Sequence, residues 1–183
     1  MSEPAPRWSL SRLGLQRWIV SGLGIGYMPV ASGTWGSAVA AALALAVWGG
    51  FQLTSASPAL LDVAWIVLTL IASACCVIWG PWAVEYYAAR SRKQGDPGVV
   101  VIDEFAGQWI ALVALPFDTL RSTLIILAVQ FLLFRFFDVG KFPPARQLER
   151  LPHGWGILLD DLAAGAYANI CGQILFRLIF PGV

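Results

Sequence analysis

Long blocks of apolar residues, separated by short polar breaks, dominate the pattern along this chain. A helix needs about 20 residues to cross a hydrocarbon core of about 30 Å, and prolines fall in most of the breaks, where helices are expected to end. The candidate spans cover residues 37–53, 60–79, 102–115, 120–137 and 157–180. The third is too short to cross unaided as a helix, and the sequence leaves open whether it crosses or re-enters. The pattern therefore predicts an all-α protein, a polytopic membrane bundle with four or five spans, in a single domain covering residues 1–183.

Residues 1–30 have a different pattern. Arg7, Arg12 and Arg17 interleave with leucines and with Trp8 and Trp18, which is typical of a helix that lies in the membrane interface. A flexible tail is the alternative. The segment lacks the compact apolar core and small-residue cleavage site of a signal peptide.

Composition and charge support a membrane protein. Apolar residues make up 58% of the 183, charged residues only 13%, and the mean hydropathy is +0.70, whereas soluble domains carry about 25% charged residues. The net charge is +1, with no basic block suited to a phosphate backbone. These values exclude a disordered protein, a nucleic-acid-binding module and an ordinary cytosolic enzyme. They leave the oligomeric state open.

Basic residues predict the orientation. If the N-terminus is cytoplasmic and the chain crosses five times, nine basic residues fall inside and two fall outside or near the far end of the last span, as the positive-inside rule requires. The nine are Arg7, Arg12, Arg17, Arg90, Arg92, Lys93, Lys141, Arg146 and Arg150, and the two are Arg121 and Arg177.

In this topology five carboxylates from three spans meet at the cytoplasmic edge, with Glu85 and Asp96 in the preceding segment. The adjacent acids 103/104 and 160/161 could each simply cap a helix N-terminus. Asp138 is expected at a helix C-terminus, so capping does not explain it. A cluster of oxygen ligands without nearby His or Cys favours Mg²⁺ or Mn²⁺. The five are Asp103, Glu104, Asp138, Asp160 and Asp161.

Two cations and a Gly-rich turn belong to the same edge. Arg135 and Lys141 share a helix face with Asp138; they can either bind a phosphate or form salt bridges. At the start of the first span, small residues can seat a phosphate on backbone N–H groups, or can mark an ordinary helix start. These residues are Gly33, Thr34, Gly36 and Ser37. His153 is either a headgroup ligand or a surface residue. Further on, 163–166 is a run of small residues that lets a neighbouring helix approach closely.

Four stretches of the sequence resemble the phosphatidylglycerophosphatase A family of bacterial inner-membrane lipid phosphatases. They are Gly33-Thr-Trp-Gly-Ser37, Asp96-Pro-Gly-Val-Val-Val-Ile-Asp-Glu-Phe-Ala-Gly107, Phe134-Arg-Phe-Phe-Asp-Val-Gly-Lys141 and His153-Gly-Trp-Gly-Ile-Leu-Leu-Asp-Asp-Leu-Ala-Ala-Gly165. Glu85 matches an acid that precedes the second stretch in the family. The chain departs from the family at Ser32 and Phe142, where proline is common, which affects loop shape rather than charge.

The resemblance implies an all-helical fold and a Mg²⁺-dependent phosphatase that converts phosphatidylglycerophosphate to phosphatidylglycerol and phosphate at the cytoplasmic face of the inner membrane. The candidate metal ligands are then Asp103, Glu104, Asp138, Asp160 and Asp161. Some of these are expected to hold the ion, and one that does not, Asp161 or Glu104, is expected to act as general base. Arg135 and Lys141 are expected to neutralise the phosphate, and Glu85 and Asp96 to support the ligands. Direct attack by water is the expected route, and a covalent aspartyl-phosphate stays open.

A cation- or proton-coupled transporter is the main alternative function. It would place acids near the middle of the spans and show internal repeats, whereas here the acids lie at one edge and no repeat is found. A headgroup transferase is a third possibility, but the chain lacks a spaced run of Asp that could hold a nucleotide-activated donor.

Overall fold

The computed structural model describes residues 10–54, 57–88, 98–149, 151 and 154–181, and this part of the chain is helical with no strand. The elements are α1 (Leu10–Val20), a 3₁₀ turn (Ile25–Tyr27), α2 (Ser32–Thr54), α3 (Pro58–Ala88), α4 (Ile102–Ile110), α5 (Leu120–Gly140), α6 (Ala145–Leu148), α7 (Gly154–Ile174) and a π turn (Leu175–Ile179). The all-α class is confirmed.

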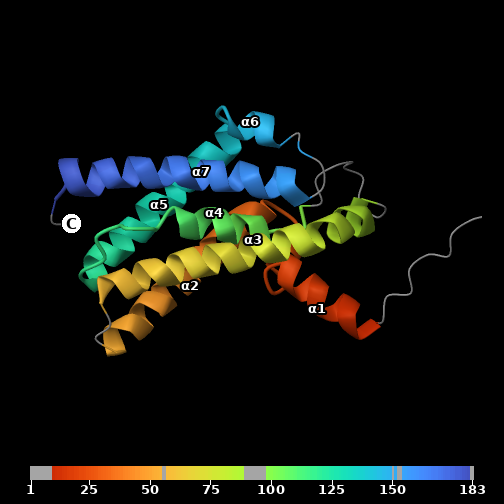
Figure 1. Cartoon of the computed structure of the whole chain (residues 1–183), viewed down its shortest axis with the longest axis horizontal. Helices are drawn as coiled ribbons and strands as arrows, with labels where there is room; N and C mark the ends of the chain where they lie inside the picture. The colour runs from red at the N-terminus through yellow and green to blue at the C-terminus, as the bar shows by residue number, and fades with distance from the viewer. Residues whose placement is uncertain (1–9, 55–56, 89–97, 150, 152–153, 182–183) are drawn as a thin grey trace, which may run out of the picture.

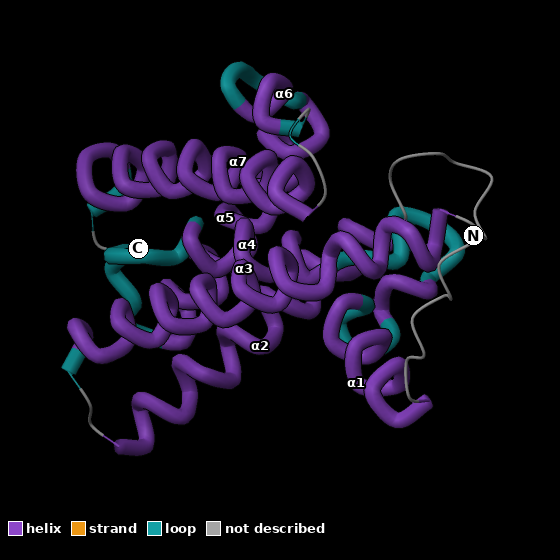
Figure 2. Tube along the Cα trace, turned by 45° about the vertical axis from the view of Figure 1, so that its right-hand side comes forward, coloured by secondary structure: helices purple, strands orange, loops and turns teal. Residues whose placement is uncertain are grey.

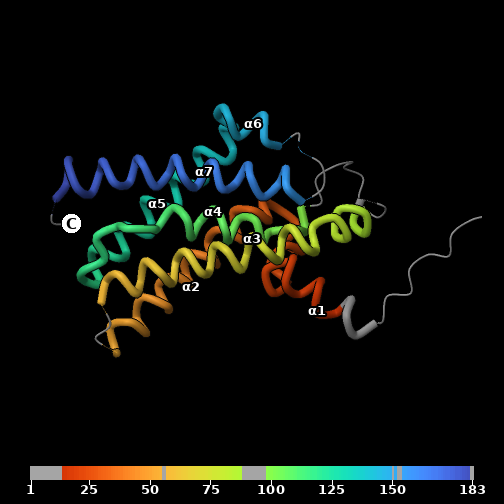
Figure 3. The backbone as a smooth tube through the Cα atoms, in the orientation of Figure 1, coloured from red at the N-terminus to blue at the C-terminus, as the bar shows by residue number. Residues whose placement is uncertain are grey.

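Four of these helices are long and apolar enough to cross a membrane: Ser32–Thr54, Pro58–Tyr87, Leu120–Gly140 and Gly154–Ile179. They surround the short helix α4, which lies at the centre of the bundle (Figures 1 and 2). α1 lies at one end of the bundle, and the end of α7 lies at the other (Figure 3). We call the end where α2, α4 and α7 begin the acidic end, and the opposite end the far end.

The third predicted span crosses the bundle, but not as a continuous helix. α4 begins at the acidic end and stops at Ile110. Residues 111–119 then run in turns and extended backbone to the far end, where the carbonyl of Asp118 accepts a hydrogen bond from Gln52 at 3.4 Å. The chain therefore passes between the two ends five times. The expectation of a helix over 102–115 was wrong in its second half.

Polar side chains from neighbouring helices satisfy the backbone of this unwound stretch. Asn169 donates to the carbonyls of Ala111 and Val113 at 3.0 and 2.8 Å, and Gln173 donates to Val113 at 3.0 Å. The N–H of Ala114 donates to Asp62 at 2.8 Å, and Arg177 donates to the carbonyl of Ala114 at 2.6 Å. Non-helical backbone is tolerated at membrane depth only when it is satisfied in this way.

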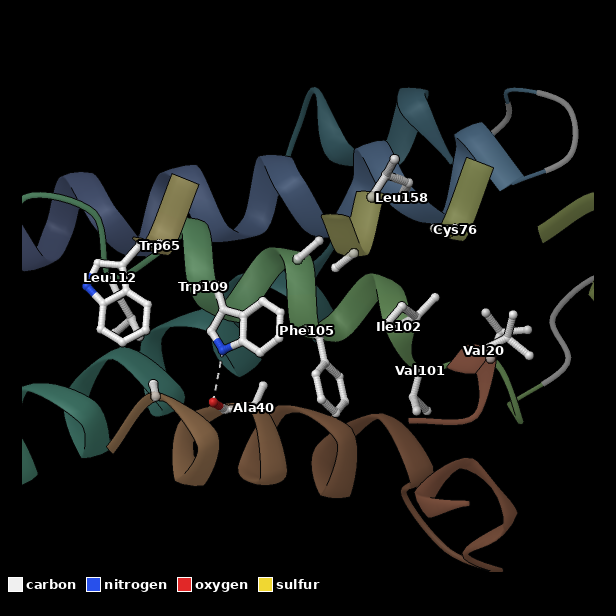
Figure 4. Close-up of a cluster of buried hydrophobic side chains, with 14 of the residues drawn as sticks. Val20, Ala40, Trp65, Cys76, Val101, Ile102, Phe105, Trp109, Leu112 and Leu158 are labelled. Carbon is white, nitrogen blue, oxygen red and sulfur yellow. Dashed lines mark hydrogen bonds between the residues drawn. The ribbon is translucent and has the colours of Figure 1, made fainter. Parts of the chain in front are cut away.

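The core is centred on α4. Phe105 and Trp109 project from α4 toward α2, and the indole N–H of Trp109 donates to the carbonyl of Ala40 at 3.0 Å (Figure 4). On the other side, a Cβ placed on Gly107 would lie 2.7 Å from the carbonyl oxygen of Asp161. The absence of a side chain at Gly107 and Gly165 therefore allows α4 and α7 to approach closely, which brings their acidic residues together.

The end of α3 differs from the sequence expectation, whereas α1 agrees with it. α3 continues through Pro81 to Ala88, although the predicted span ended at residue 79. A proline removes one helical hydrogen bond, and a membrane helix packed among others can tolerate this loss. α1 confirms a helix within residues 1–30; its Trp18 is exposed, and the Arg17 guanidinium lies 4.5 Å from the centre of the Tyr86 ring.

Candidate active site

α4 carries two acids in its first turn, where the free N–H groups of a helix favour negative charge. The backbone N–H of Glu104 donates to an oxygen of Asp103 at 3.0 Å, so Asp103 satisfies one of the free N–H groups in the first turn of its own helix. Both side chains are nonetheless buried, at 3% and 8% exposure. Burial of this kind is costly for a charged group unless other charges compensate it.

Three carboxylates from three helices form the centre of the site. Oxygens of Glu104 from α4, Asp138 from the last turn of α5 and Asp161 from α7 all lie within 4.8 Å of one another. We call these three residues the carboxylate triad. All three are buried. Like charges at this separation repel strongly in a buried site, so the triad requires positive charge.

Arg135 supplies part of that charge. Its Nη1 lies 2.6 Å from Glu104 Oε2 and 2.8 Å from Asp138 Oδ2, and Ser37 Oγ donates to the same Glu104 oxygen at 2.8 Å. The charge and hydrogen bond of Arg135 and the hydrogen bond of Ser37 stabilise the ionised form of Glu104.

Lys141 forms a second charged group beside the triad. It ends α5 in a left-handed conformation (φ 49°), which directs the chain back toward α7. Its ammonium donates to Asp160 and lies 3.3 Å from Glu149. Burial lowers the pKa of Lys141, but the hydrogen bond to Asp160 and the charges of Asp160 and Glu149 outweigh burial and raise it above the ordinary value. Lys141 therefore stays protonated at physiological pH.

These groups line a cavity of about 260 Å³, which we call the acid pocket. Its lining includes all five acids of the predicted cluster together with Lys141, Glu149, Ser32 and Gly33. Asp160 Oδ1 is buried in this region without a hydrogen-bond partner. A second cavity of about 590 Å³, the side chamber, shares Gly33, Glu104, Asp138 and Lys141 with the acid pocket and adds Arg135, Tyr27 and Met28.

Gly33 lies where α2 meets the triad. A Cβ built on it would collide with Glu104 Oε1 and would lie 3.3 Å from Arg135 Nη1. Glycine at this position therefore leaves room for the Glu104 carboxylate and the Arg135 guanidinium beside the start of α2. One turn further on, Ser37 donates to Glu104, so α2 also helps to orient this acid.

Comparison with known proteins identifies the family of the chain. The family described as Phosphatidylglycerophosphatase A matches residues 18–176. The chain belongs to the phosphatidylglycerophosphatase A family. A Haemophilus influenzae protein named Phosphatidylglycerophosphatase A is 34% identical over 171 residues, which cover 93% of this chain and 94% of the relative. Membership of the family makes the protein a phosphatase enzyme, and its apolar helices make it a membrane protein.

Two further relatives differ in name and coverage. A Bacteroides thetaiotaomicron protein named "Putative phosphatidylinositol-3-phosphatase" is 35% identical over 152 residues, covering 83% of this chain and 87% of the relative. An Escherichia coli Phosphatidylglycerophosphatase A is 38% identical over 81 residues, covering 44% and 45% of the two chains. No solved structure matches the chain.

In this phosphatidylglycerophosphatase A family member, the structure does not bring every predicted site residue to the acid pocket. Thr34 and Glu85 are absent from the linings of both cavities, and Glu85 is exposed on α3. Gly36 packs against Val101 of the segment that leads into α4 rather than lining a cavity. Asp96 and His153 lie outside the described residues. The roles of all these residues stay predictions.

The structure also adds residues that the sequence did not single out. Glu149 pairs with Lys141, and the backbone of 26–31 forms one wall of the side chamber. Glu149 lies eight residues beyond Lys141 after two prolines, and no regular spacing relates the two. For Arg135, the structure favours the salt-bridge interpretation, extended from Asp138 to Glu104 as well.

Proposed function

We propose that the protein hydrolyses the terminal phosphomonoester of phosphatidylglycerophosphate, giving phosphatidylglycerol and inorganic phosphate, with Mg²⁺ as cofactor. The active site would face the cytoplasm at a bacterial inner membrane. The observation that carries this proposal is the convergence of the carboxylate triad beside two cations in an open pocket. The names of the relatives support the substrate class.

The donor set fits a hard divalent cation. The triad offers three carboxylate oxygens within 4.8 Å of one another, and the unpartnered Oδ1 of Asp160 offers a fourth nearby in the same pocket. Oxygen ligands alone favour Mg²⁺ or Mn²⁺ over zinc or copper. Glu104, Asp138 and Asp161 would hold the ion, with Asp103 and Asp160 as further candidates. A bound Mg²⁺ would neutralise phosphate charge and make a nearby water more acidic.

The remaining groups would bind the phosphate and hold it in position. Lys141 lines both cavities with its side chain partly exposed, so it can contact an anion while still holding Asp160. Ser32 and Gly33 line both cavities at the start of α2, where free helical N–H groups favour phosphate oxygens. Arg135 is engaged by two carboxylates, and its main effect would be to keep them ionised.

Hydrolysis then requires a proton acceptor for water. Attack by the water oxygen forms one P–O bond and breaks the bond to the glycerol oxygen, which leaves as the lipid alcohol after taking up a proton. Of the two expected bases, Glu104 already accepts hydrogen bonds from Arg135 and Ser37 on one oxygen. These bonds stabilise its ionised form and weaken it as a base. Asp161 is therefore the better candidate of the two, and it would take the proton on the carboxylate oxygen that does not hold the ion.

A substrate panel tests the proposal. The purified protein in detergent would be given phosphatidylglycerophosphate, phosphatidylinositol-3-phosphate and phosphatidic acid, with phosphate release as the measurement. We expect phosphatidylglycerophosphate to have the highest kcat/KM, and EDTA to stop the reaction until Mg²⁺ is added. Preference for phosphatidylinositol-3-phosphate, or turnover that persists in EDTA, would contradict the substrate or the cofactor respectively.

A further inference from the structure

A groove between α2 and α5 runs along the outside of the bundle directly beyond the active site. It has a volume of about 290 Å³. We call it the α2–α5 groove. Ala42, Leu124 and Ala128 are exposed along it, so it opens to the surroundings of the bundle rather than to the core. Its lining consists entirely of apolar side chains: Ala38, Ala41, Ala42, Leu45, Leu124, Leu127, Ala128 and Phe131.

The groove is aligned with the active site along both helices. On α5, Phe131 in the groove is followed four residues later by Arg135, a step of about 6 Å at the helical rise. On α2, Ala38 follows Ser37, which binds Glu104. The side chamber is lined by Gly33 at the start of α2 and by Arg135, Asp138 and Val139 near the end of α5. The groove and the side chamber therefore involve the same two helices, with the groove nearer the far end.

This arrangement matches an amphiphile in polarity. The acidic end of α2 and α5 presents charged and polar groups, and the next two turns present only alanine, leucine and phenylalanine. The lined stretch spans eight residues on each helix, about 10 Å at the helical rise, which is enough for the part of an acyl chain nearest the headgroup. It is a single channel between two helices, which suits one hydrocarbon chain rather than two.

We propose that the α2–α5 groove holds one acyl chain of the lipid substrate, and that the headgroup enters the acid pocket sideways from the membrane through the side chamber. This inference rests on the proposed function, because only a lipid substrate has an acyl chain to place there. With the acyl chain held in the groove, the phosphomonoester would lie near the triad, at a depth in the membrane set by α2 and α5.

Filling the groove tests the inference. Ala42→Trp and Ala128→Trp would each place a large side chain in it, two or more turns from the triad. We expect kcat/KM for long-chain phosphatidylglycerophosphate to fall about tenfold, which corresponds to about 1.4 kcal/mol. Turnover of a water-soluble analogue with very short acyl chains should stay within twofold of the unmodified protein. Ala74→Trp, at an exposed position of α3 outside the cavity linings, is the matched control.

The comparison of substrates separates the two proposals. If the unmodified protein hydrolyses neither substrate, the proposed function fails. If it hydrolyses both and the groove variants keep full activity on the long-chain lipid, the groove inference alone is overturned. Equal losses on both substrates would overturn it as well. A photoactivatable acyl chain on the lipid gives a second measurement: crosslinks to residues 38–45 and 124–131 support the inference, and crosslinks confined to other helices contradict it.

Discussion

Each member of the carboxylate triad lies close to the other two. Within the triad, the guanidinium of Arg135 forms ion pairs with Glu104 and Asp138. Without a cation, removing one charge should therefore relieve repulsion, because buried like charges oppose one another. With a cation, the same change should remove a ligand. Stability and activity of triad variants are thus expected to move in different directions.

We predict that Asp138→Asn and Asp161→Asn each lower kcat by about a thousandfold, within the range for loss of a charge-stabilising group. Their melting temperatures in EDTA should equal or exceed that of the unmodified protein. Mg²⁺ should raise the melting temperature of the unmodified protein, since a ligand that binds the folded state stabilises it, but not that of the variants. The measurements are phosphate release and thermal unfolding in detergent.

Asp118→Asn is the matched control for these variants, because Asp118 is exposed at the far end. It should keep both activity and the Mg²⁺-dependent rise in melting temperature. If the triad variants also keep this rise, the triad does not hold the ion.

Gly33 allows a second test at single-residue resolution. Gly33→Ala places a methyl group on Glu104 Oε1 and near Arg135, so Glu104 must move away from the other two acids. We expect a loss of activity of about a hundredfold, as small misplacements of catalytic groups can cause, with little loss of stability because alanine favours a helix. Gly49→Ala, on the same helix with nothing within 4 Å of the new methyl, should be active. Equal activity of the two variants would contradict this account of Gly33.

Among the elements, the unwound part of the third crossing depends most on its neighbours. Asn169→Leu removes the donor to the carbonyls of Ala111 and Val113 while keeping a similar volume. A buried carbonyl without a partner costs about 1–3 kcal/mol, and Gln173 still binds Val113. We therefore predict a loss of about 1–3 kcal/mol in the free energy of unfolding, measured by denaturation in detergent.

Gln52→Leu is the comparison for this prediction. Gln52 also donates to a backbone carbonyl, that of Asp118, but it is exposed. Water can replace its hydrogen bond, so the expected change is below about 0.5 kcal/mol, as for most surface substitutions. A larger loss for Gln52→Leu than for Asn169→Leu would contradict the proposed role of Asn169.

The break in α4 also shows what the sequence could and could not predict. Four spans and the acids at their ends follow from apolar blocks bounded by polar residues, because hydrocarbon excludes charge. The end of α4 at Ile110 has no local signal: residues 111–115 are Ala-Leu-Val-Ala-Leu, and proline comes only at 116. The break depends on donors in α7, about 60 residues away, and no periodicity of the segment itself contains that information.

The charged site, too, could be predicted from the sequence only in part. Asp103, Asp138 and Asp161 could be placed at one end from the order of spans, since alternate ends of successive helices lie together. The sequence could not show which acids approach most closely. Their separation depends on the contact of Gly107 with α7 and of Gly33 with Glu104. The exposure of Glu85 on α3 likewise depends on the rotation of a long helix about its axis.

For the molecule as a whole, the distribution of basic residues specifies an orientation. Lys141 and Arg146 follow α5 at the acidic end, and the segment between α3 and α4 contains Arg90, Arg92 and Lys93. The far end has Arg121 and Arg177, of which Arg177 binds the carbonyl of Ala114. Because short loops rich in Lys and Arg stay in the cytoplasm, the acidic end, and with it the acid pocket, should face the cytoplasm.

Single cysteines test this orientation together with the fifth crossing. In a background where Cys75, Cys76 and Cys171 are replaced by alanine, we predict that a membrane-impermeant maleimide labels Thr54→Cys and Asp118→Cys in spheroplasts. Gln147→Cys, exposed on α6, should be labelled only in inverted vesicles. Asp118 is decisive because it follows the unwound stretch and should be labelled from the same side as Thr54→Cys. If α4 re-entered the membrane and returned, Asp118→Cys would be labelled only in inverted vesicles, and Gln147→Cys would be labelled in spheroplasts. That result would reduce the crossings to four and place α5 in the opposite direction, separating Asp138 from Asp103, so the triad could not form.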